Sequence, residues 1–377
     1  MIHRIILISI FALLIFARCG KETDKTYNTA ITTQKEPPPP AHVTVEVIDG
    51  VQYVHNGEIP YSNVQLDSEM VIGDEKDGFY FGYPPSLIRE DNKGDLYIDS
   101  GTGAVKSISK ITRYGKFIKN IGSRGQGPGE FTVLKSMHIL KDNRLWIFDN
   151  GQLRWQVYSP EGEYLFGNRV PFYGTIEVYN DILYGVRMEG FDVKETTIEN
   201  FKSDFVYIIQ KFDMQSHTIG YIGKKRKGFY SNPENFKGIK EDDSQFSNFW
   251  GATYSKIAID NSGDVYMAYY FQNAIEVYKG DSLSIYIDRT MQVPEGVRIQ
   301  NVSCCLDNKN NLYVLRMKPQ SYEFWLEIFN QKGFLLHRIP IHGKLITAMY
   351  VGRDNKIYLA DGLTYTITRY KAIIEPK

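Results

Sequence analysis

Two patterns of apolar and polar residues recur along most of the chain. In the first, a polar turn that begins with Asp or Asn leads into a strand with an aromatic residue between aliphatic ones, as in Asp91–Ile98 and Asp307–Val314. Asp, Asn and Gly accept the backbone angles of tight turns, and aromatic and β-branched residues favour strands, so each copy predicts a β-hairpin. Six copies occur, and their aromatic residues are Tyr97, Trp146, Tyr184, Tyr266, Tyr313 and Tyr358.

The second pattern is an alternating strand that ends in an aromatic residue, as in Ala274–Tyr278, and one copy follows each copy of the first. Two hairpins per repeat make a four-stranded antiparallel unit. The aromatic residues of the first pattern lie 49, 38, 82, 47 and 45 residues apart, and blades of β-propellers repeat every 40 to 50 residues or so. The long interval holds two expected insertions, at about residues 186–206 and 223–250. The pattern therefore predicts an all-β fold, a six-bladed β-propeller over residues 42–377.

The last repeat supplies only three strands of its own. The stretch Asn63–Gly73 alternates apolar and polar residues as a strand does. We expect this N-terminal strand to complete the last blade, because closing the ring removes exposed sheet edges. An all-β sandwich, the alternative fold, does not predict six matched pairs of patterns.

The N-terminus has the pattern of a targeting segment. A short basic start, Met1–Arg4, precedes the apolar run Ile5–Phe16. A membrane-spanning helix needs roughly 20 apolar residues, so residues 1–18 predict a signal peptide. Cys19 follows directly, and this arrangement resembles the lipobox of bacterial lipoproteins, although Phe16 and Arg18 depart from its commonest form. The resemblance implies that Cys19 is lipidated; ordinary export or an uncleaved anchor is the alternative.

Residues 19–41 are polar, lack periodicity and end with four prolines and an alanine. Such a segment buries no apolar surface, and its proline run is stiff, so we expect a tether between the lipid anchor and the folded domain. The expected location is the cell envelope, where the exported chain is lipid-anchored to a membrane and either periplasmic or surface-exposed.

The charges balance, with 44 Lys and Arg against 44 Asp and Glu. The longest basic run is Lys224–Lys227, which excludes the phosphate-binding electrostatics of a nucleic-acid partner. Without residues 1–18 the count is 42 basic against 44 acidic residues, because Arg4 and Arg18 are lost and no acid is. Membrane contact is therefore expected through the N-terminal lipid rather than through a basic patch.

A glycine-rich stretch, Ile121–Phe131, follows the first repeat. It resembles the segment between blades in the six-bladed, NHL-repeat-like propellers that several bacterial phyla export, many of them as lipoproteins. The likeness covers about residues 43–375; it implies the fold and an exported location and assigns no reaction. A phosphate-binding loop is the alternative interpretation, but the stretch lacks the Gly-Lys-Ser/Thr ending and no helix start follows, so we interpret it as a structural turn.

Polar or otherwise unusual residues occur on the innermost strands of the expected blades. We expect these residues to face a central channel and to be candidates for ligand binding, with a hydrogen-bonded structural role as the alternative for each. They are Arg89, His138, Glu177, Lys256, Cys304 and Tyr350. Cys304 and Cys305 are interpreted as buried free thiols, with a vicinal disulfide as the alternative in an oxidising compartment.

The longer insertion is rich in aromatic residues, which argues against disorder and suits a surface that binds glycan or peptide. Packing of these rings against a blade edge is the alternative. The candidates are Phe229, Tyr230, Phe236, Phe249 and Trp250.

No catalytic motif is recognisable: the sequence has no His-x-x-x-His, Cys-x-x-Cys or Gly-x-Ser-x-Gly. The first hypothesis is a binding or scaffolding module, without catalysis, for an unknown protein, peptide or glycan. The second is a calcium-dependent, lactonase-like hydrolase or lyase with its site at the channel mouth, because related six-bladed enzymes hold calcium there. The third is an accessory lipoprotein that binds glycans at the surface. Metal ligands cannot be assigned from spacing alone.

Overall fold

The hairpin turns are closed by the side chains that the sequence pattern places there. Asp91 Oδ1 accepts hydrogen bonds from the backbone N–H groups of Lys93 and Asp95, at 2.8 and 3.0 Å. Asp260 and Asp307 hold the corresponding turns of later repeats in the same way. The Asp that begins each of these turns therefore fixes where one strand ends and the next begins.

The computed structural model describes residues 38–75, 79–100, 107–170, 172, 174–187, 205–226, 255–270, 273–289 and 299–374. All regular elements in this part of the chain are β-strands, which confirms the predicted all-β class. The same residues include no helix of the length and apolarity that crossing a membrane requires. Residues 39–377 make up one compact unit.

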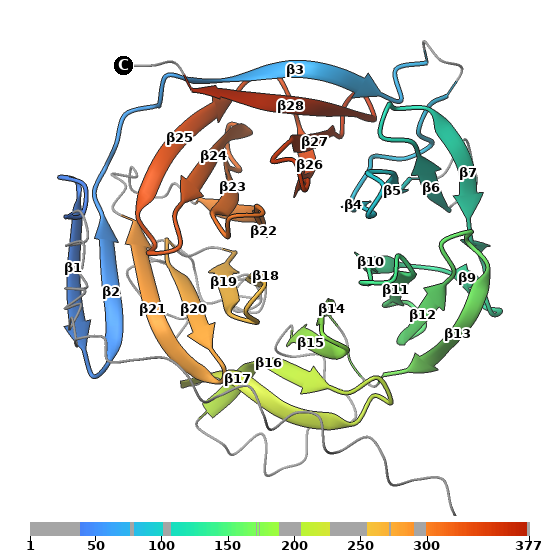
Figure 1. Cartoon of the computed structure of the whole chain (residues 1–377), viewed down its shortest axis with the longest axis horizontal. Coiled ribbons are helices and arrows are strands. Elements are labelled where there is room, and N and C mark those ends of the chain that lie inside the picture. The colour runs from blue at the N-terminus through green and yellow to red at the C-terminus, as the bar shows by residue number, and fades with distance from the viewer. Residues whose placement is uncertain are drawn as a thin grey trace, which may run out of the picture. The chain divides into compact units, whose positions relative to one another are not determined.

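Six sheets surround a central axis, and the strand order of each sheet runs outward from that axis (Figure 1). The first blade contains β4 (Ile88–Glu90), β5 (Leu96–Asp99), β6 (Ile108–Ile111) and β7 (Phe117–Ile121). The second contains β10 (Leu134–Ile139), β11 (Leu145–Asp149), β12 (Arg154–Tyr158) and β13 (Tyr164–Arg169). The third contains β14 (Gly174–Tyr179), β15 (Ile182–Arg187), β16 (Phe205–Phe212) and β17 (Thr218–Arg226).

The second half of the ring repeats this plan. The fourth blade begins with β18 (Ser255–Ile259), β19 (Val265–Tyr269), β20 (Ile275–Lys279) and β21 (Ser282–Arg289). The fifth contains β22 (Gln300–Leu306), β23 (Leu312–Lys318), β24 (Glu323–Phe329) and β25 (Leu335–Ile341). The sixth contains β26 (Ile346–Val351), β27 (Ile357–Asp361), β28 (Thr366–Ile374) and β3 (Val64–Ile72). Two short parallel strands, β8 (Ser123–Arg124) and β9 (Glu130–Phe131), lie in the connection between the first two blades.

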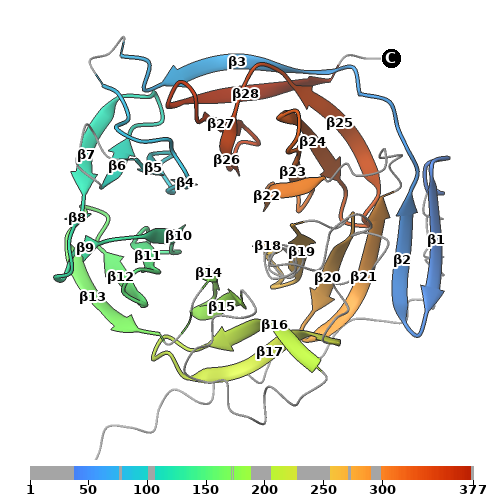
Figure 2. The same ribbon diagram turned by 180° about the vertical axis from the view of Figure 1, so that it is seen from behind.

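The ring closes as the sequence predicts. β3 pairs antiparallel with β28, in a register that places Ile72 opposite Ile367 and Gln65 opposite Ile373. Figure 2 shows the two strands side by side along the outer edge of the sixth blade. The N-terminal and C-terminal parts of the propeller are thereby held in one sheet.

The fourth blade differs from the expected four strands. Two further strands, β1 (Val43–Ile48) and β2 (Val51–Asn56), extend it to six, because β2 pairs in parallel with β21 and β1 pairs with β2. The fully buried Asn56 side chain anchors this hairpin on the fifth blade: it donates to the Gly333 carbonyl at 2.9 Å and accepts from the Leu335 N–H at 2.7 Å. The hairpin of β1 and β2 therefore joins two blades from the outside.

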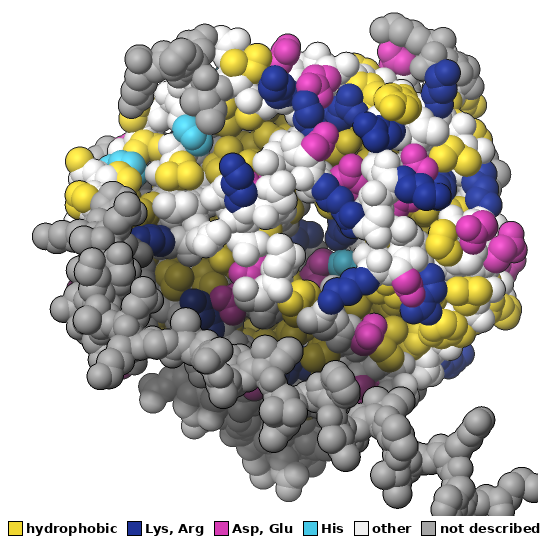
Figure 3. All heavy atoms as spheres, in the orientation of Figure 1, with side chains coloured by type: hydrophobic (Ala, Val, Ile, Leu, Met, Phe, Trp, Pro, Cys, Tyr) yellow, Lys and Arg dark blue, Asp and Glu magenta, His cyan; other side chains and the backbone are white. Residues whose placement is uncertain are grey.

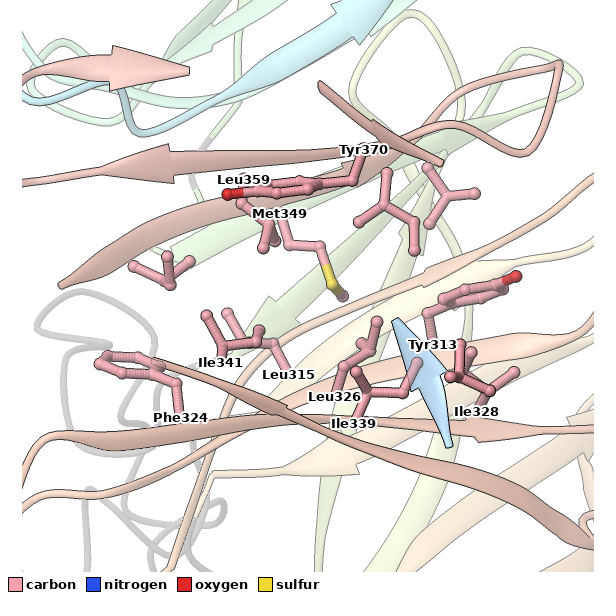
Figure 4. Close-up of a cluster of buried hydrophobic side chains, with 14 residues drawn as sticks. Tyr313, Leu315, Phe324, Leu326, Ile328, Ile339, Ile341, Met349, Leu359 and Tyr370 are labelled. Carbon is pink, nitrogen blue, oxygen red and sulfur yellow. The ribbon is translucent and has the colours of Figure 1, made fainter. Parts of the chain in front are cut away.

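Apolar side chains fill the spaces between neighbouring blades. Figure 4 shows Met349 and Leu359 of the sixth blade facing Leu315 and Leu326 of the fifth, and all four are buried. Each fully buried aliphatic side chain stabilises a fold by about 1.5–3 kcal/mol. Packing between the blades therefore fixes the positions of the inner strands that line the axis.

A buried ionic cluster lies between the fourth and fifth blades. Glu327, whose side chain is 0% exposed, lies 3.1 Å from Arg289, 3.2 Å from Arg316 and 3.1 Å from Arg338. Burial acts to raise the pKa of Glu327, but the three guanidinium groups outweigh it and lower that pKa to about 2. Glu327 is therefore ionised throughout the physiological range.

Candidate functional site in the central channel

The register of the repeats brings four of the six inner-strand candidates to the same position in their blades. Five inner-strand residues lie directly opposite an aromatic residue of the first sequence pattern, and the sixth position is occupied by Ala258, two residues after Lys256. The five pairs are Arg89 with Tyr97, His138 with Trp146, Glu177 with Tyr184, Cys305 with Tyr313, and Tyr350 with Tyr358. Cys305, rather than the expected Cys304, holds the equivalent position in the fifth blade.

Glu177 lies at the meeting point of three blades. Its Oε1 is 3.7 Å from Arg89 Nη2, and its Oε2 is 3.4 Å from His138 Nε2. The side chains of Arg89 and Glu177 are 21% and 26% exposed, so both are partly accessible from the channel. Figure 3 shows an opening at the centre of the ring, with basic, acidic and histidine side chains around it.

Arg89 is held on two further sides. Its Nη1 donates to the Ile88 carbonyl at 2.9 Å, and the guanidinium carbon lies 5.9 Å from the centre of the Tyr350 ring. The structure therefore brings Arg89, His138, Glu177 and Tyr350 together. Lys256 of the fourth blade acts on the same carboxyl group through its charge.

The surroundings change the protonation of these groups. Burial raises the pKa of Glu177 to about 7, against the opposing effects of Arg89 and Lys256. Burial, together with the charge of Arg89, lowers the pKa of His138 to about 3, so this imidazole is neutral at physiological pH. Its Nε2–H donates to the Ile176 carbonyl at 3.1 Å. Near pH 7 the site combines two cationic side chains, a neutral histidine and a carboxyl group that is partly protonated.

The two adjacent cysteines lie on opposite faces of β22. Cys304 packs against the cluster between the fourth and fifth blades, which includes Leu312, and Cys305 packs against the next cluster, which includes Met349. Both thiols are free in the structure. Burial raises the pKa of Cys305 to about 12 and also raises that of Cys304, so neither is a reactive thiolate. A vicinal bridge would require distortion of the strand.

The glycine-rich connection is filled by its own residues. The backbone N–H of Gly127 donates to Glu130 Oε2 at 2.7 Å, and a Cβ on Gly125 would overlap the same carboxylate. Arg154 donates to the carbonyl groups of Gln126, Gly127 and Glu130 from the neighbouring blade. A carboxylate thus occupies the place that a phosphate would need, which supports the interpretation as a structural turn.

One contributor to the channel was not predicted from the sequence. Ser136, two residues before His138 on the same strand face, accepts a hydrogen bond from the Ile176 N–H at 2.8 Å. Together with the bond from His138 to the Ile176 carbonyl, it fixes β10 against β14 beside Glu177. Ser136 could have been found from the sequence, because residues two apart on a strand lie on the same face and His138 was already a candidate.

Several predictions fall outside the described residues. They concern the signal peptide, Cys19, most of the tether and of both insertions, and the surface candidates Phe229, Tyr230, Phe236, Phe249 and Trp250. Within the described ranges, no group of three or more His, Cys, Asp and Glu residues is arranged to hold a metal ion.

The family model described as 6-bladed beta-propeller matches residues 111–302, which is 192 of the 377 residues and thus half of the chain. NHL repeat-containing protein 3 of Homo sapiens is 32% identical over 87 residues, which is 22% of this chain and 25% of that protein. Its Mus musculus counterpart is 29% identical over 83 residues, covering 22% of this chain and 24% of that protein. The chain thus matches about a quarter of the length of these curated relatives.

Two solved structures have a similar fold. A member of the DUF4221 family from Bacteroides vulgatus superimposes with a TM-score of 0.59 and 11% identity, covering 84% of this chain and all (100%) of that one. A Bacteroides fragilis protein gives a TM-score of 0.57 and 15% identity, covering 86% of this chain and 100% of its own. These similarities concern the fold alone. Given the matched family model and the six sheets around one axis, the chain belongs to the 6-bladed beta-propeller family.

Proposed function

We propose that this protein is an exported, membrane-tethered β-propeller that binds a small ligand or a peptide at its central channel, without catalysis of its own. The observation that carries the proposal is the convergence of Arg89, His138 and Glu177 from three different blades onto one point of the channel. Side chains that meet from separate elements in a partly accessible cavity are the usual form of a binding site.

The fold itself does not require polar residues at these positions. The fourth and fifth blades carry Ala258 and Cys305 at the equivalent register, and both blades form complete sheets. Burial of Glu177 beside a single arginine is also unfavourable for its charged form, as its raised pKa indicates. Charged groups placed where the fold accepts alanine, at some cost in stability, indicate binding rather than structural support.

The charges of the channel favour an anion or a polar ligand over calcium. Calcium takes 6 to 8 or so oxygen ligands, most of them from carboxylates and carbonyl groups. Glu177 is flanked by Arg89 and acted on by Lys256, and both cations would repel a divalent metal ion at this point. The calcium-dependent hydrolase is therefore the weaker of the two hypotheses for this site.

A specific observation keeps a second function open, namely proton-transfer catalysis of the kind that a lyase uses. The Glu177 carboxyl, with a pKa of about 7, can both give and accept a proton near neutral pH. Chemical change of a ligand that contacts Glu177 would assign this function, whereas recovery of the ligand unchanged would support binding alone.

The binding proposal is tested by screening the purified protein against small metabolites and short peptides by thermal shift, followed by calorimetry. Arg89→Ala should weaken binding of any hit at least about tenfold, since it removes a charge-assisted contact. Arg113→Ala, on the exposed side of the first blade, is the matched control and should leave binding unchanged. Ligands that bind Arg89→Ala as tightly as Arg113→Ala would contradict binding in the channel. A screen that finds no ligand would contradict it as well.

The proposed anchoring has a separate test. It rests on the sequence pattern around Cys19, which follows the apolar run Ile5–Phe16. Expression of the wild type with a labelled fatty acid should label the protein, and Cys19→Ala should abolish both the label and membrane association. If the Cys19→Ala variant carries no label but still associates with the membrane, lipid anchoring through Cys19 would be contradicted.

A further inference from the structure

The Arg89 guanidinium forms a long ion pair with Glu177. The separation of 3.7 Å between Nη2 and Oε1 exceeds the 2.7–2.9 Å or so of a charge-assisted hydrogen bond. Meanwhile the Ile88 carbonyl and the Tyr350 ring fix the orientation of the guanidinium. A planar, oriented guanidinium matches the two oxygens of a carboxylate, and part of its surface is accessible from the channel.

A second cation, Lys256, acts on Glu177 from a blade across the ring from that of Arg89. Lys256 lies on β18 of the fourth blade, and Arg89 lies on β4 of the first. Arg89 lies 3.7 Å from the Glu177 carboxyl group, and the charge of Lys256 also favours the ionised form of Glu177. An anion that enters the channel beside Glu177 would be attracted by both cations and repelled by Glu177.

We propose that the channel binds a small organic acid through its carboxylate, with Arg89 and Lys256 as the cationic partners, and that binding is coupled to the uptake of one proton by Glu177. This inference rests on the proposed function, since it specifies the ligand of the same channel.

The coupling follows from the crowding of two carboxyl groups. A ligand carboxylate against Arg89 lies beside Glu177, and two carboxylates in one site cannot both ionise freely, so the pKa of one of them rises strongly. Glu177 starts with a pKa of about 7 and is therefore the group that takes the proton. Once protonated, its O–H can donate a hydrogen bond to the ligand carboxylate. The proton comes from solvent, and no covalent bond is formed or broken.

The other titratable groups around Glu177 keep their protonation over this range. The pKa of His138 is lowered to about 3, so the imidazole stays neutral. The pKa of Tyr350 is raised to about 12, and the pKa values of both thiols are raised as well, so these groups stay protonated. His138 on β10 and Arg89 on β4 lie within 3.7 Å of the Glu177 carboxyl group, and Lys256 on β18 acts on it through its charge. Cys304 and Cys305 on β22 interact with the charge of Glu177, and Tyr350 on β26 contacts Arg89.

The test is calorimetry of the purified protein with acetate, succinate, citrate and gluconate, at pH 6, 7, 8 and 9 and in two buffers of different ionisation enthalpy. The wild type should bind at least one of these acids. Its affinity should fall about fivefold from pH 7 to pH 8 and about tenfold from pH 8 to pH 9, as the protonated fraction of a group with pKa near 7 declines. The buffer dependence should report the uptake of close to one proton at pH 8.

Three variants separate the parts of the inference. Glu177→Gln, which mimics the protonated carboxyl, should bind the acid with constant affinity from pH 6 to pH 9 and without proton uptake. Arg89→Ala should lose at least about tenfold in affinity. Arg89→Lys keeps the positive charge and should recover part of that loss, which would show that the channel still folds. Arg113→Ala should behave as the wild type does.

The contrary outcomes are distinct. Binding of succinamide or neutral peptides in the channel without binding of any acid would overturn the organic-acid inference and leave the proposed function standing. Binding of an acid with no pH dependence would overturn the coupling to Glu177. Binding that Arg89→Ala does not weaken would place the acid elsewhere, and the absence of every ligand would contradict both proposals.

Discussion

Glu177, which is partly exposed to the channel, and the fully buried Glu327 both lie close to arginine, yet their pKa values shift in opposite directions. Glu327 has three guanidinium groups within 3.2 Å, and their attraction outweighs the cost of burial. Glu177 has one guanidinium, at 3.7 Å, and the cost of burial prevails. The number and distance of the cationic partners therefore decide the charge of a buried carboxyl group.

The raised pKa of Glu177 predicts how stability depends on pH. Because its pKa is higher in the folded chain (about 7) than its ordinary value of 4.5, the folded state holds more protons between these two pH values, and stability falls as the pH rises through them. Glu177→Gln removes this loss. We expect the advantage of Glu177→Gln over the wild type to grow by about 2–3 kcal/mol from pH 4.5 to pH 7.5.

Urea denaturation at several pH values measures this difference. The matched control is Glu163→Gln, a substitution of an exposed glutamate on the surface of the second blade. It should show no such growth. A constant difference between Glu177→Gln and the wild type over the whole range would contradict the raised pKa.

Glu327→Gln should have the opposite sign and a larger effect. Removal of the carboxylate leaves three arginines buried around a neutral side chain, and breaking a buried ion pair from one side costs about 3–5 kcal/mol. The wild type should also lose stability as the pH falls from 4.5 toward about 2. In this range Glu327 binds a proton in the unfolded chain but stays ionised in the folded chain, so acid favours the unfolded state.

The control for Glu327 lies on the same strand. Glu323 begins β24 and pairs with Lys318 at 2.9 Å, with its side chain 59% exposed. Glu323→Gln should change the free energy of unfolding by less than about 1 kcal/mol at pH 7. Equal effects of the two substitutions would show that the buried cluster does not contribute as its geometry indicates.

Local sequence predicts hairpins well and sheet partners poorly. The turns at Asp91 and Asp307 are determined by residues within four positions, so the sequence reveals them. The pairing of β2 with β21 joins Asn56 to Arg289, and it depends on which sheet edge lies near the N-terminal hairpin. Nothing in the alternation of Val51–Asn56 specifies that edge, which is why the two additional strands of the fourth blade were not predicted.

Arg154 should stabilise the connection between the first two blades. Arg154 donates three hydrogen bonds to carbonyl groups of the glycine-rich stretch. Arg154→Ala should destabilise the protein by about 2–3 kcal/mol and speed hydrogen exchange of the backbone amides of residues 122–131. Arg144→Ala, which removes a partly exposed pair with Asp142 and a contact with the Phe166 ring, is the control and should change stability by less than about 1 kcal/mol. Unchanged exchange in Arg154→Ala would contradict the structural role of this stretch.

The repeats predict the number of blades and the strands from which the channel residues come. Equivalent positions of a repeat reach equivalent depths, so Arg89, His138 and Glu177 could be assigned to the channel from their strands alone. Their mutual distances could not, because they depend on the packing of three blades against one another. The sequence likewise did not reveal that Glu177 titrates near pH 7, since its neighbours come from other blades.

Closure of the ring by β3 predicts that one substitution there weakens blades far from it. Ile72 is 1% exposed and packs in the cluster with Ile367, whereas Val71, the next residue on β3, is 42% exposed. Ile72→Ala should lower the free energy of unfolding by about 2–4 kcal/mol, and Val71→Ala by about 1 kcal/mol at most.

Tryptophan fluorescence, measured in a Trp250→Phe background, reports on the second blade through Trp146 and Trp155 and on the fifth blade through Trp325. Far-UV circular dichroism reports on all strands. If β3 couples the ring, both signals should shift to lower denaturant together in Ile72→Ala. A separate early transition that leaves the tryptophan midpoint unchanged would mean that the sixth blade opens on its own.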